Sequence, residues 1–135
     1  CLLGQKDYQQ QLIIKDYVST KKIMTDIVSL PIVREKSGLA MSSRNNYLSE
    51  EDRKHCGKIY SCILNLAESL KISSLDSSKG QASRFLEKAG FEIDYLEIVD
   101  AKNLSSVTEK TDEFLIAVAV IYKKVRLIDN IVVYL

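Results

Sequence analysis

The sequence has no excess of charge of either sign and no apolar run long enough to cross a bilayer. Its 19 basic and 18 acidic residues leave a formal net charge of +1, which gives no electrostatic reason to expect binding to nucleic acid or to a membrane. The longest apolar run, FLIAVAVIY at 114–122, is about half the length of a membrane-spanning helix. Any binding of phosphate must therefore depend on a few local side chains.

Cysteine and histidine are also scarce. The three cysteines, Cys1, Cys56 and Cys62, are an odd number without the spacing of metal ligands, and we expect no metal held by the protein. On one helix, Cys56 and Cys62 would lie on different faces. The one histidine, His55, has no neighbouring histidine or glycine, and we interpret it as a surface or helix-packing residue. A reduced, cytoplasmic setting is the expectation.

The chain is short and begins within an apolar segment. Its 135 residues are enough for one domain, or for one domain with a piece of another. The opening CLLGQKDYQQ has neither an initiator methionine nor the pattern of a signal peptide. We expect a piece of a longer protein.

The first part of the chain predicts a strand, a helix and a second strand. The first strand ends at Gly4, and Asp7 is a candidate cap for a helix over residues 8–24. The β-branched segment 27–33, with the single proline Pro31, favours a strand. This order predicts a right-handed parallel crossover, the unit of a Rossmann-like nucleotide-binding domain.

The rest of the chain predicts a small α+β unit. Residues 34–47 are typical of an ordered loop, and Ser49 is a candidate cap for a long helix that has a possible kink at Gly57. A mobile linker is expected at 73–78, followed by a helix that ends at Gly90. Three strands are predicted at 92–99, 114–122 and 126–134, with a hairpin at Lys123-Lys124 between the last two.

These patterns indicate an α/β protein with two parts. Residues 1–32 are interpreted as a remnant strand–helix–strand of a Rossmann-like domain, and residues 33–135 as a C-terminal α+β domain with a three-stranded antiparallel sheet and helices. Asp129 and Asn130 are expected to form a turn or bulge between strand segments. The acidic residues Asp94, Glu97 and Asp100 are interpreted as charges on an exposed strand face.

The first candidate binding cluster is Gly4-Gln5-Lys6-Asp7, followed by Gln9 and Gln10. A glycine between a strand and a helix lets backbone approach a ligand, the helix start offers free N–H groups, and a lysine adds positive charge for phosphate. An ordinary turn with a solvated Lys–Asp pair explains the same residues, and spacing alone favours that explanation.

The second candidate cluster is the segment 38–45, GLAMSSRN. Its serine hydroxyls and backbone amides suit phosphate oxygens, and Arg44 can bind such oxygens with a forked guanidinium group. A loop whose serines and asparagines only satisfy turns is equally compatible with the pattern.

Taken together, the two clusters resemble one enzyme family. The strings GQKDYQQ, PIVREKSGLAMSSRNNYLS and RLIDNIVV resemble the C-terminal portion of the pantothenate synthetase (pantoate–β-alanine ligase) family along essentially the whole chain. This family belongs to the nucleotidylyltransferase superfamily, and its Met-Ser-Ser-Arg loop is similar to the Lys-Met-Ser-Lys-Ser signature of class I aminoacyl-tRNA synthetases.

The resemblance implies a reaction and a set of roles. Pantoate attacks the α-phosphate of ATP with magnesium, and β-alanine then displaces AMP from pantoyl adenylate to give pantothenate. Lys6 and Arg44 are the implied catalytic residues, since they offset triphosphate charge. Gln10 is the implied pantoate ligand. The implied ATP contacts are Gly4, Gln5, Lys6, Asp7, Val33, Met41, Ser42, Ser43 and Arg44.

The resemblance also implies that part of the family's active site is not in this sequence. The family's His-x-Gly-His loop is not in the sequence, so we expect the isolated chain to be inactive. The C-terminal domain is the implied lid, with a hinge near 34–38, and the full-length enzyme is the implied homodimer. Three alternatives remain: a non-catalytic folded domain, a related nucleotidylyltransferase that adenylates another small carboxylic acid, and a purely structural interaction domain.

Overall fold

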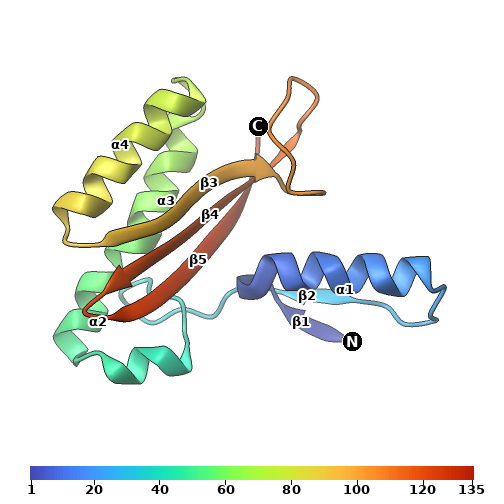
Figure 1. Cartoon of the computed structure of the whole chain (residues 1–135), viewed down its shortest axis with the longest axis horizontal. Helices are drawn as coiled ribbons and strands as arrows, with labels where there is room; N and C mark the ends of the chain where they lie inside the picture. Colours follow the sequence, from blue (N-terminus) through green and yellow to red (C-terminus); the bar gives the residue numbers. More distant parts are fainter.

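The computed structural model describes residues 1–135 and consists of two lobes (Figure 1). The N-terminal lobe contains β1 (Leu2–Gly4), the short 3-10 helix η1 (Gln5–Asp7), α1 (Tyr8–Thr20) and β2 (Val28–Leu30). Strands β1 and β2 are parallel, with Leu3 opposite Ser29, as the predicted crossover requires. The predicted cap at Asp7 is wrong in its detail, because the Asp7 side chain makes no capping hydrogen bond.

Helix α1 lies over a sheet of only two strands, and this leaves much of it uncovered. It ends at Thr20 instead of Met24 because the chain turns at Lys22, which has a φ of 52°. Of the apolar face predicted for it, Ile13 is 62% exposed and Tyr17 is 57% exposed. The small parallel unit therefore contributes little to the hydrophobic core.

The C-terminal lobe is built on an antiparallel sheet in the order β3-β4-β5. The strands are β3 (Glu92–Asp100), β4 (Glu113–Tyr122) and β5 (Val125–Tyr134). Lys123 and Lys124 form the predicted hairpin turn with φ values of 47° and 66°, a left-handed turn whose twist matches that of paired strands. All three strands are close to their predicted bounds.

Helices α3 (Lys58–Ser69) and α4 (Leu75–Lys88) cover one face of this sheet (Figure 1). Side chains alternate between the two faces of a strand, so one set of strand residues meets the helices. The shared core includes Ile59, Ile63, Leu66, Leu86, Leu96, Ile116, Val118, Val120 and Leu127. The opposite face of the sheet, called the outer face below, carries no helix from this lobe.

The predicted long helix is divided at Gly57 into α2 (Glu50–Cys56) and α3. The Ser49 hydroxyl caps α2 by accepting from Asp52 N at 3.0 Å, as predicted. A Cβ atom at Gly57 would lie 2.2 Å from the Ser37 carbonyl oxygen. Glycine is therefore needed there because another part of the chain crosses the helix at close range.

The expected linker at 73–78 is wrong. Ser74 caps α4 by accepting from Ser77 N at 3.2 Å, and Ser78 is buried in that helix. The serines therefore begin a helix, since a hydroxyl can satisfy a free N–H of the first turn. The helix is followed by Gly90 with a φ of 88°, the predicted left-handed residue.

Histidine and cysteine both serve packing. The His55 ring stacks on Phe91 and Tyr122, with centroid distances of 5.5 and 5.2 Å, and its Nε2 lies 2.7 Å from the Ala89 oxygen. Burial raises the pKa of the Cys56 and Cys62 thiols to about 11. Both thiols face the core because the helix break separates them, which corrects the expectation that they lie on different faces of one helix. No helix in the structure is long and apolar enough to cross a membrane.

Candidate functional site

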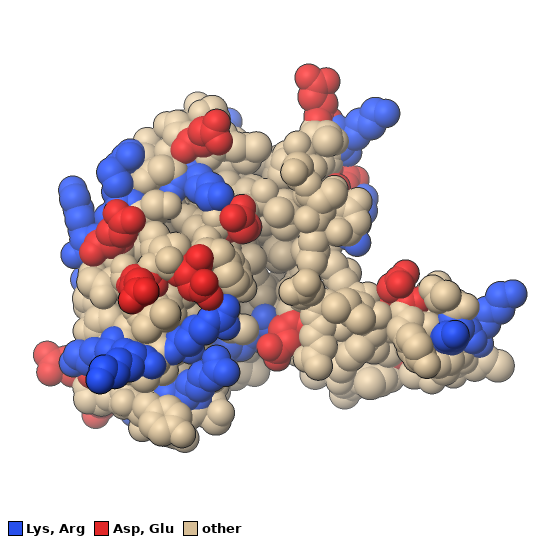
Figure 2. Space-filling view, in the orientation of Figure 1, with Lys and Arg blue, Asp and Glu red and all other residues tan.

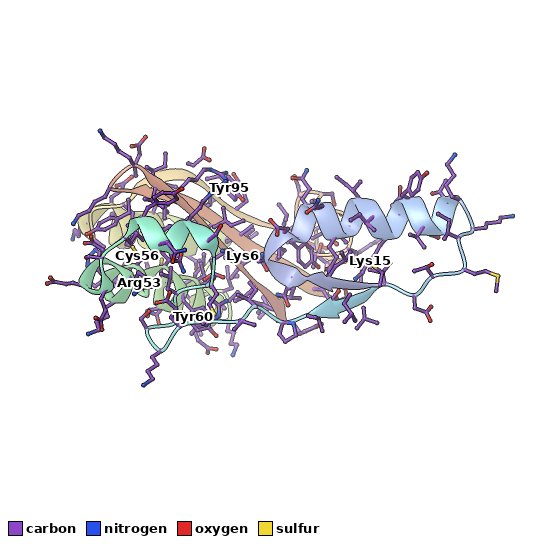
Figure 3. The ribbon with its side chains drawn as sticks, turned by 90° about the horizontal axis from the view of Figure 1, so that it is seen from below. Lys6, Lys15, Arg53, Cys56, Tyr60 and Tyr95 are labelled. Carbon is purple, nitrogen blue, oxygen red and sulfur yellow. The ribbon has the colours of Figure 1, made fainter.

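The strand-to-helix corner of the N-terminal lobe presents an open surface. A Cβ atom at Gly4 would meet no heavy atom within 4 Å, so a ligand can approach the backbone there. The Lys6 side chain leaves η1 toward the C-terminal lobe and donates to the Met41 oxygen at 3.0 Å. In Figure 3, Lys6 lies where the lobes meet, whereas Lys15 lies farther along α1. The two clusters identified in the sequence are thus in contact.

The second cluster is ordered, as the sequence indicates, but part of it is helical and not a loop. Residues Ser43–Tyr47 form a 3-10 helix, η2, and the Ser42 hydroxyl caps it by accepting from Arg44 N at 3.2 Å. Asn45, only 3% exposed, donates to the Ala40 oxygen at 3.1 Å and to a Glu35 carboxylate oxygen at 3.2 Å. This buried asparagine fixes the base of the segment that carries Ser42, Ser43 and Arg44.

The two clusters line one cavity of about 340 Å³. Lys6 and Asp7 come from the corner, and residues of β5 form a third wall. The complete lining is Lys6, Asp7, Met41, Ser42, Ser43, Arg44, Arg126, Leu127 and Ile128. The cavity therefore combines the candidate residues with a strand that sequence reasoning had assigned only a structural role.

Burial and nearby charges both shift the pKa of the Lys6 ammonium group. Burial is the largest influence and lowers the pKa of the Lys6 ammonium group below its ordinary value. The carboxylates of Asp129 and Asp7 oppose this shift, whereas Arg44 and Arg34 add to it by repulsion. An anionic ligand would relieve this repulsion, because it adds negative charge between the cations. Figure 2 shows basic side chains gathered on the face that carries the β4–β5 turn.

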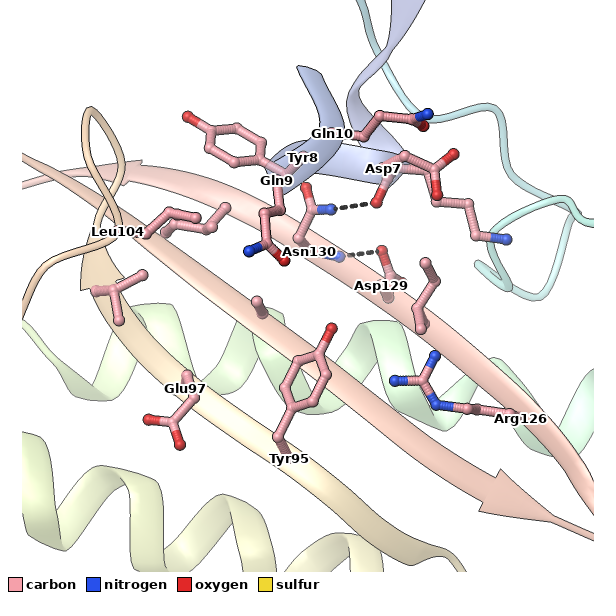
Figure 4. Close-up of a pocket in the computed structure, with 15 residues that line it drawn as sticks. Asp7, Tyr8, Gln9, Gln10, Tyr95, Glu97, Leu104, Arg126, Asp129 and Asn130 are labelled. Atoms are coloured by element: carbon pink, nitrogen blue, oxygen red, sulfur yellow. Dashed lines mark hydrogen bonds between the residues drawn. The ribbon is translucent and has the colours of Figure 1, made fainter. Parts of the chain in front are cut away.

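Four predicted residues lie outside this cavity's lining. Gly4 forms the open corner beside it, and the Gln5 amide donates to Asn130 Oδ1 at 3.3 Å. Val33 is 65% exposed on the segment that follows β2. Gln10 lines a neighbouring groove of about 520 Å³ between the start of α1 and the outer face of the sheet (Figure 4).

Asn130 attaches the corner to β5. Its Nδ2 donates to the Gln5 oxygen at 3.1 Å and to the Lys6 oxygen at 3.0 Å. These bonds satisfy two backbone carbonyls and hold η1 against the sheet, and Figure 4 draws one of them beside Asn130. Asn130 thus positions Lys6 from the far end of the sequence.

Asp129 attaches the same strand to the segment that follows β2. It accepts two hydrogen bonds from Arg34, at 2.6 and 2.9 Å. Arg34 also donates to the Gly38 oxygen at 3.0 Å and lies 3.6 Å from the Tyr60 ring centroid. The two bonds from Arg34 offset the cost of burying the Asp129 carboxylate inside a strand.

The expectation of a turn or bulge at Asp129 and Asn130 is therefore wrong. Strand β5 pairs with β4 without a register shift from Val125 to Tyr134. Sequence reasoning missed the role of these two residues. The available signal was two adjacent polar residues inside an apolar strand, which require partners when buried.

The remaining acidic candidates are paired or capping groups at the surface. Asp94 pairs with Arg126 at 2.9 Å, and Glu97 pairs with Lys79 at 3.0 Å. Asp100 accepts from Lys102 N at 2.8 Å in a local turn. The structure contains no group of three or more His, Cys, Asp or Glu side chains placed to hold a metal ion.

The fold and the cavity together define a protein of the nucleotidylyltransferase type, in which a parallel strand–helix–strand corner faces an α+β lobe. A family model described as pantoate-beta-alanine ligase matches residues 1–132. The chain belongs to the pantoate-beta-alanine ligase family.

Curated relatives agree with this assignment. Pantothenate synthetase from Vesicomyosocius okutanii subsp. Calyptogena okutanii (strain HA) is 45% identical over 132 residues, which are 97% of this chain and 46% of the relative. The pantothenate synthetase from Thermosipho africanus (strain TCF52B) is 38% identical over 132 residues, which are 96% of this chain and 48% of that relative. The chain spans about half the length of these relatives.

Solved structures show the same fold. Pantothenate synthetase from Thermus thermophilus superposes with a TM-score of 0.89 at 34% identity, over 99% of this chain and 49% of that one. Pantoate-beta-alanine ligase from Francisella tularensis, complexed with beta-gamma ATP and beta-alanine, has a TM-score of 0.64 at 30% identity, over 96% of this chain and 42% of its own.

Proposed function

We propose that this chain forms the ATP-binding side of a pantothenate synthetase site that another part of the enzyme completes. The observation that carries the proposal is the contact between Lys6 and Met41, which joins the corner and the Ser42–Arg44 segment around one cavity. Lys6, Arg44 and two serine hydroxyls on one cavity suit a triphosphate. The Francisella relative, named as a complex with ATP and beta-alanine, supports the choice of ligands.

The proposed reaction has two steps. A carboxylate oxygen of pantoate attacks the α-phosphorus of ATP, the bond to the β-phosphate breaks, and pyrophosphate leaves with the electron pair. The amine of β-alanine then attacks the acyl carbon of pantoyl adenylate and loses a proton as AMP leaves. Lys6 and Arg44 would stabilise charge on the phosphates. The Gln10 amide would bind pantoate through both donor and acceptor atoms.

Adenine and ribose would meet the corner and the segment after β2. Gly4 allows close approach of backbone, and Gln5, Asp7 and Val33 each present exposed or half-exposed surface. Met41 and Ser43 complete the ATP contacts from the other cluster. No general base is required of the protein, since orientation and charge stabilisation supply the rate enhancement.

Magnesium is implied by the family, and the site fits it in one way only. Mg²⁺ commonly binds through one or two carboxylates and the phosphates of its nucleotide. Asp7 is the one carboxylate among the residues that line the cavity. Asp7 would hold the ion together with the triphosphate, where the ion offsets phosphate charge.

The proposed arrangement of the complete enzyme follows from the two lobes. Residues 1–32 would belong to a larger Rossmann-like domain, and residues 33–135 would form the C-terminal lid over the ATP site. A cytoplasmic homodimer is the proposed setting. Because the chain spans about half of its relatives, we propose that it does not turn over substrate alone.

Binding of ATP tests the proposal at the level of this chain. We expect Lys6→Ala and Arg44→Ala each to weaken ATP binding, measured by calorimetry, by about tenfold or more, because each removes a charged hydrogen-bond donor. Lys15→Ala is the matched control. Lys15 lies on α1 outside the cavity lining, and its ammonium group donates to the Ser29 hydroxyl on β2. Equal ATP affinity in all four proteins would refute the proposed site.

A second assay tests the dependence on the rest of the enzyme. The chain is mixed with ATP, pantoate, β-alanine and magnesium, and release of AMP is followed. We expect no turnover by the chain alone. Steady AMP release would show that the chain contains a complete site. It would overturn the proposal that another part of the enzyme completes the site.

A further inference from the structure

Arg126 lies between the candidate site and a second hollow beside the β4–β5 turn. It lines the 340 Å³ cavity with Lys6 and Arg44. It also lines a neighbouring hollow of about 510 Å³, whose walls are Arg44, Tyr47, Lys123, Lys124, Val125 and Arg126. Arg44 and Arg126 are thus shared by the two spaces, and the second space has no acidic residue in its lining.

Two of the four cations in this hollow are already paired. Lys123 lies 2.7 Å from an Asp52 carboxylate oxygen, and Arg126 pairs with Asp94. The side chains of Arg44 and Lys124 form no ion pair or hydrogen bond in the structure. The hollow therefore has a surplus of positive charge that a bound anion would neutralise.

The pairing of Arg126 depends on an irregularity in β3. The register of β3 against β4 shifts between Ile93 and Tyr95, which leaves Asp94 without a partner residue. Ile93 and Leu96 pack against the core, so the extra residue turns Asp94 to the outer face, toward Arg126. Bulges commonly re-aim a side chain in this way.

This contact holds Arg126 without using all of its donors. Its Nε and Nη2 both approach Oδ2 of Asp94, at 3.0 and 2.9 Å, and its Cζ lies 5.9 Å from the Tyr95 ring centroid. Figure 4 shows the guanidinium group near Tyr95 on the outer face. Nη1 has no hydrogen-bond partner in the structure, so one edge of an oriented guanidinium group is available to a ligand.

We propose that Arg126, together with Arg44 and Lys124, forms a pyrophosphate subsite, which binds the β- and γ-phosphates of ATP and the pyrophosphate that is released. The inference rests on the proposed function. A phosphate chain bound beside Lys6 would share its cavity with Arg44 and Arg126, and Lys124 lines the neighbouring hollow with the same two arginines. Asp94 acts as a positioning residue, because it fixes the direction of the Arg126 fork.

The test compares ligands with and without the terminal phosphates. Binding of inorganic pyrophosphate, ATP and AMP to the chain is measured by calorimetry for wild type, Arg126→Gln, Arg126→Lys and the control Lys71→Gln. Lys71 pairs with Glu68 on the exposed surface of another region. Thermal unfolding of each variant checks that it is folded, and half-exposed Arg126 allows this substitution without loss of core packing.

The expected result is selective. Arg126→Gln weakens binding of pyrophosphate and ATP about tenfold or more and leaves the affinity for AMP unchanged, because charge-assisted bonds to phosphate are lost. Arg126→Lys shows an intermediate loss, since it keeps the charge but not the fork. Lys71→Gln behaves as wild type.

Three outcomes would overturn the subsite: no binding of pyrophosphate by wild type, an unchanged pyrophosphate affinity in Arg126→Gln, or full affinity in Arg126→Lys. Failure of the proposed function looks different, since wild type would then bind neither ATP nor AMP. If only the subsite is wrong, ATP still binds and Lys6→Ala still weakens that binding, while Arg126→Gln does not.

Discussion

Asp129→Asn removes one charge from the most deeply buried ion pair in the chain. The Asp129 side chain is 3% exposed and that of Arg34 is 16% exposed, and two hydrogen bonds join them. Breaking a buried pair by removing one partner costs about 3–5 kcal/mol, because a charge is left without compensation. Arg34 keeps its bond to the Gly38 oxygen and its contact with Tyr60, so we expect the lower value, about 3 kcal/mol.

This loss is large enough to measure directly. With about 2.1 cal/mol/K of unfolding entropy per residue, 3 kcal/mol corresponds to a fall in Tm of roughly 10 °C for a chain of this size. Urea unfolding followed by circular dichroism gives the free energy, and a thermal scan gives Tm. Glu68→Gln is the control, because its pair with Lys71 is exposed and worth under about 1 kcal/mol.

A double substitution separates the ion pair from general damage to packing. Replacing a buried pair by apolar residues of similar size is often close to neutral. We therefore expect Arg34→Met/Asp129→Leu to be more stable than either single variant. A Tm for Asp129→Asn equal to that of wild type, or a double variant whose losses simply add, would refute this account of the buried pair.

Three further predictions concern Gly57 and the cysteines. Gly57→Ala should lose about 1–3 kcal/mol of stability in urea unfolding, because its Cβ would lie 2.2 Å from the Ser37 oxygen. Gly80→Ala should gain about 0.5–1 kcal/mol, because its Cβ would make only an ordinary contact, 3.5 Å from Arg84 Nη1. A tolerated Gly57→Ala would contradict the close approach. Cys56 and Cys62 have a pKa raised by burial to about 11, so the folded chain retains thiol protons that the unfolded chain releases, and stability should fall from pH 9 toward pH 11. Exposed Cys1 alone should react rapidly with a thiol reagent, and fast labelling of all three thiols would contradict the buried positions.

Signals carried by neighbouring residues were sufficient for most of the fold. The cap at Ser49, the left-handed residue at Gly90 and the hairpin at Lys123-Lys124 are each decided within a few residues. Such signals work because they describe where free backbone groups and special φ values can be satisfied. The same reasoning failed at residues 73–78, where serines suggested a linker although one of them caps a helix.

Contacts between distant residues could not be predicted in the same way. Asp129 and Asn130 were interpreted as a local turn, yet their partners Arg34 and Gln5 lie 95 and 125 residues away. A strand pattern shows that a polar residue is buried but not which side chain satisfies it. The candidate site was predictable in part, since residue types indicated both clusters, whereas the contributions of β5 required the structure.

Strand β5 also limits which parts of the site can move. It carries Asn130, which holds the backbone of the Lys6 corner, and Arg126, which lies on the same outer face. A displacement of β5 would carry the corner with it as long as these bonds persist. The segment after β2 is likewise tied to β5 through Arg34, so a motion that separates Arg34 from Asp129 costs about 3–5 kcal/mol. The Ser42–Arg44 segment is held at its base by Asn45, and the corner reaches it through the bond from Lys6 to the Met41 oxygen. A ligand that replaces the Lys6 bond breaks one exposed contact, which costs less than separating the buried Arg34–Asp129 pair.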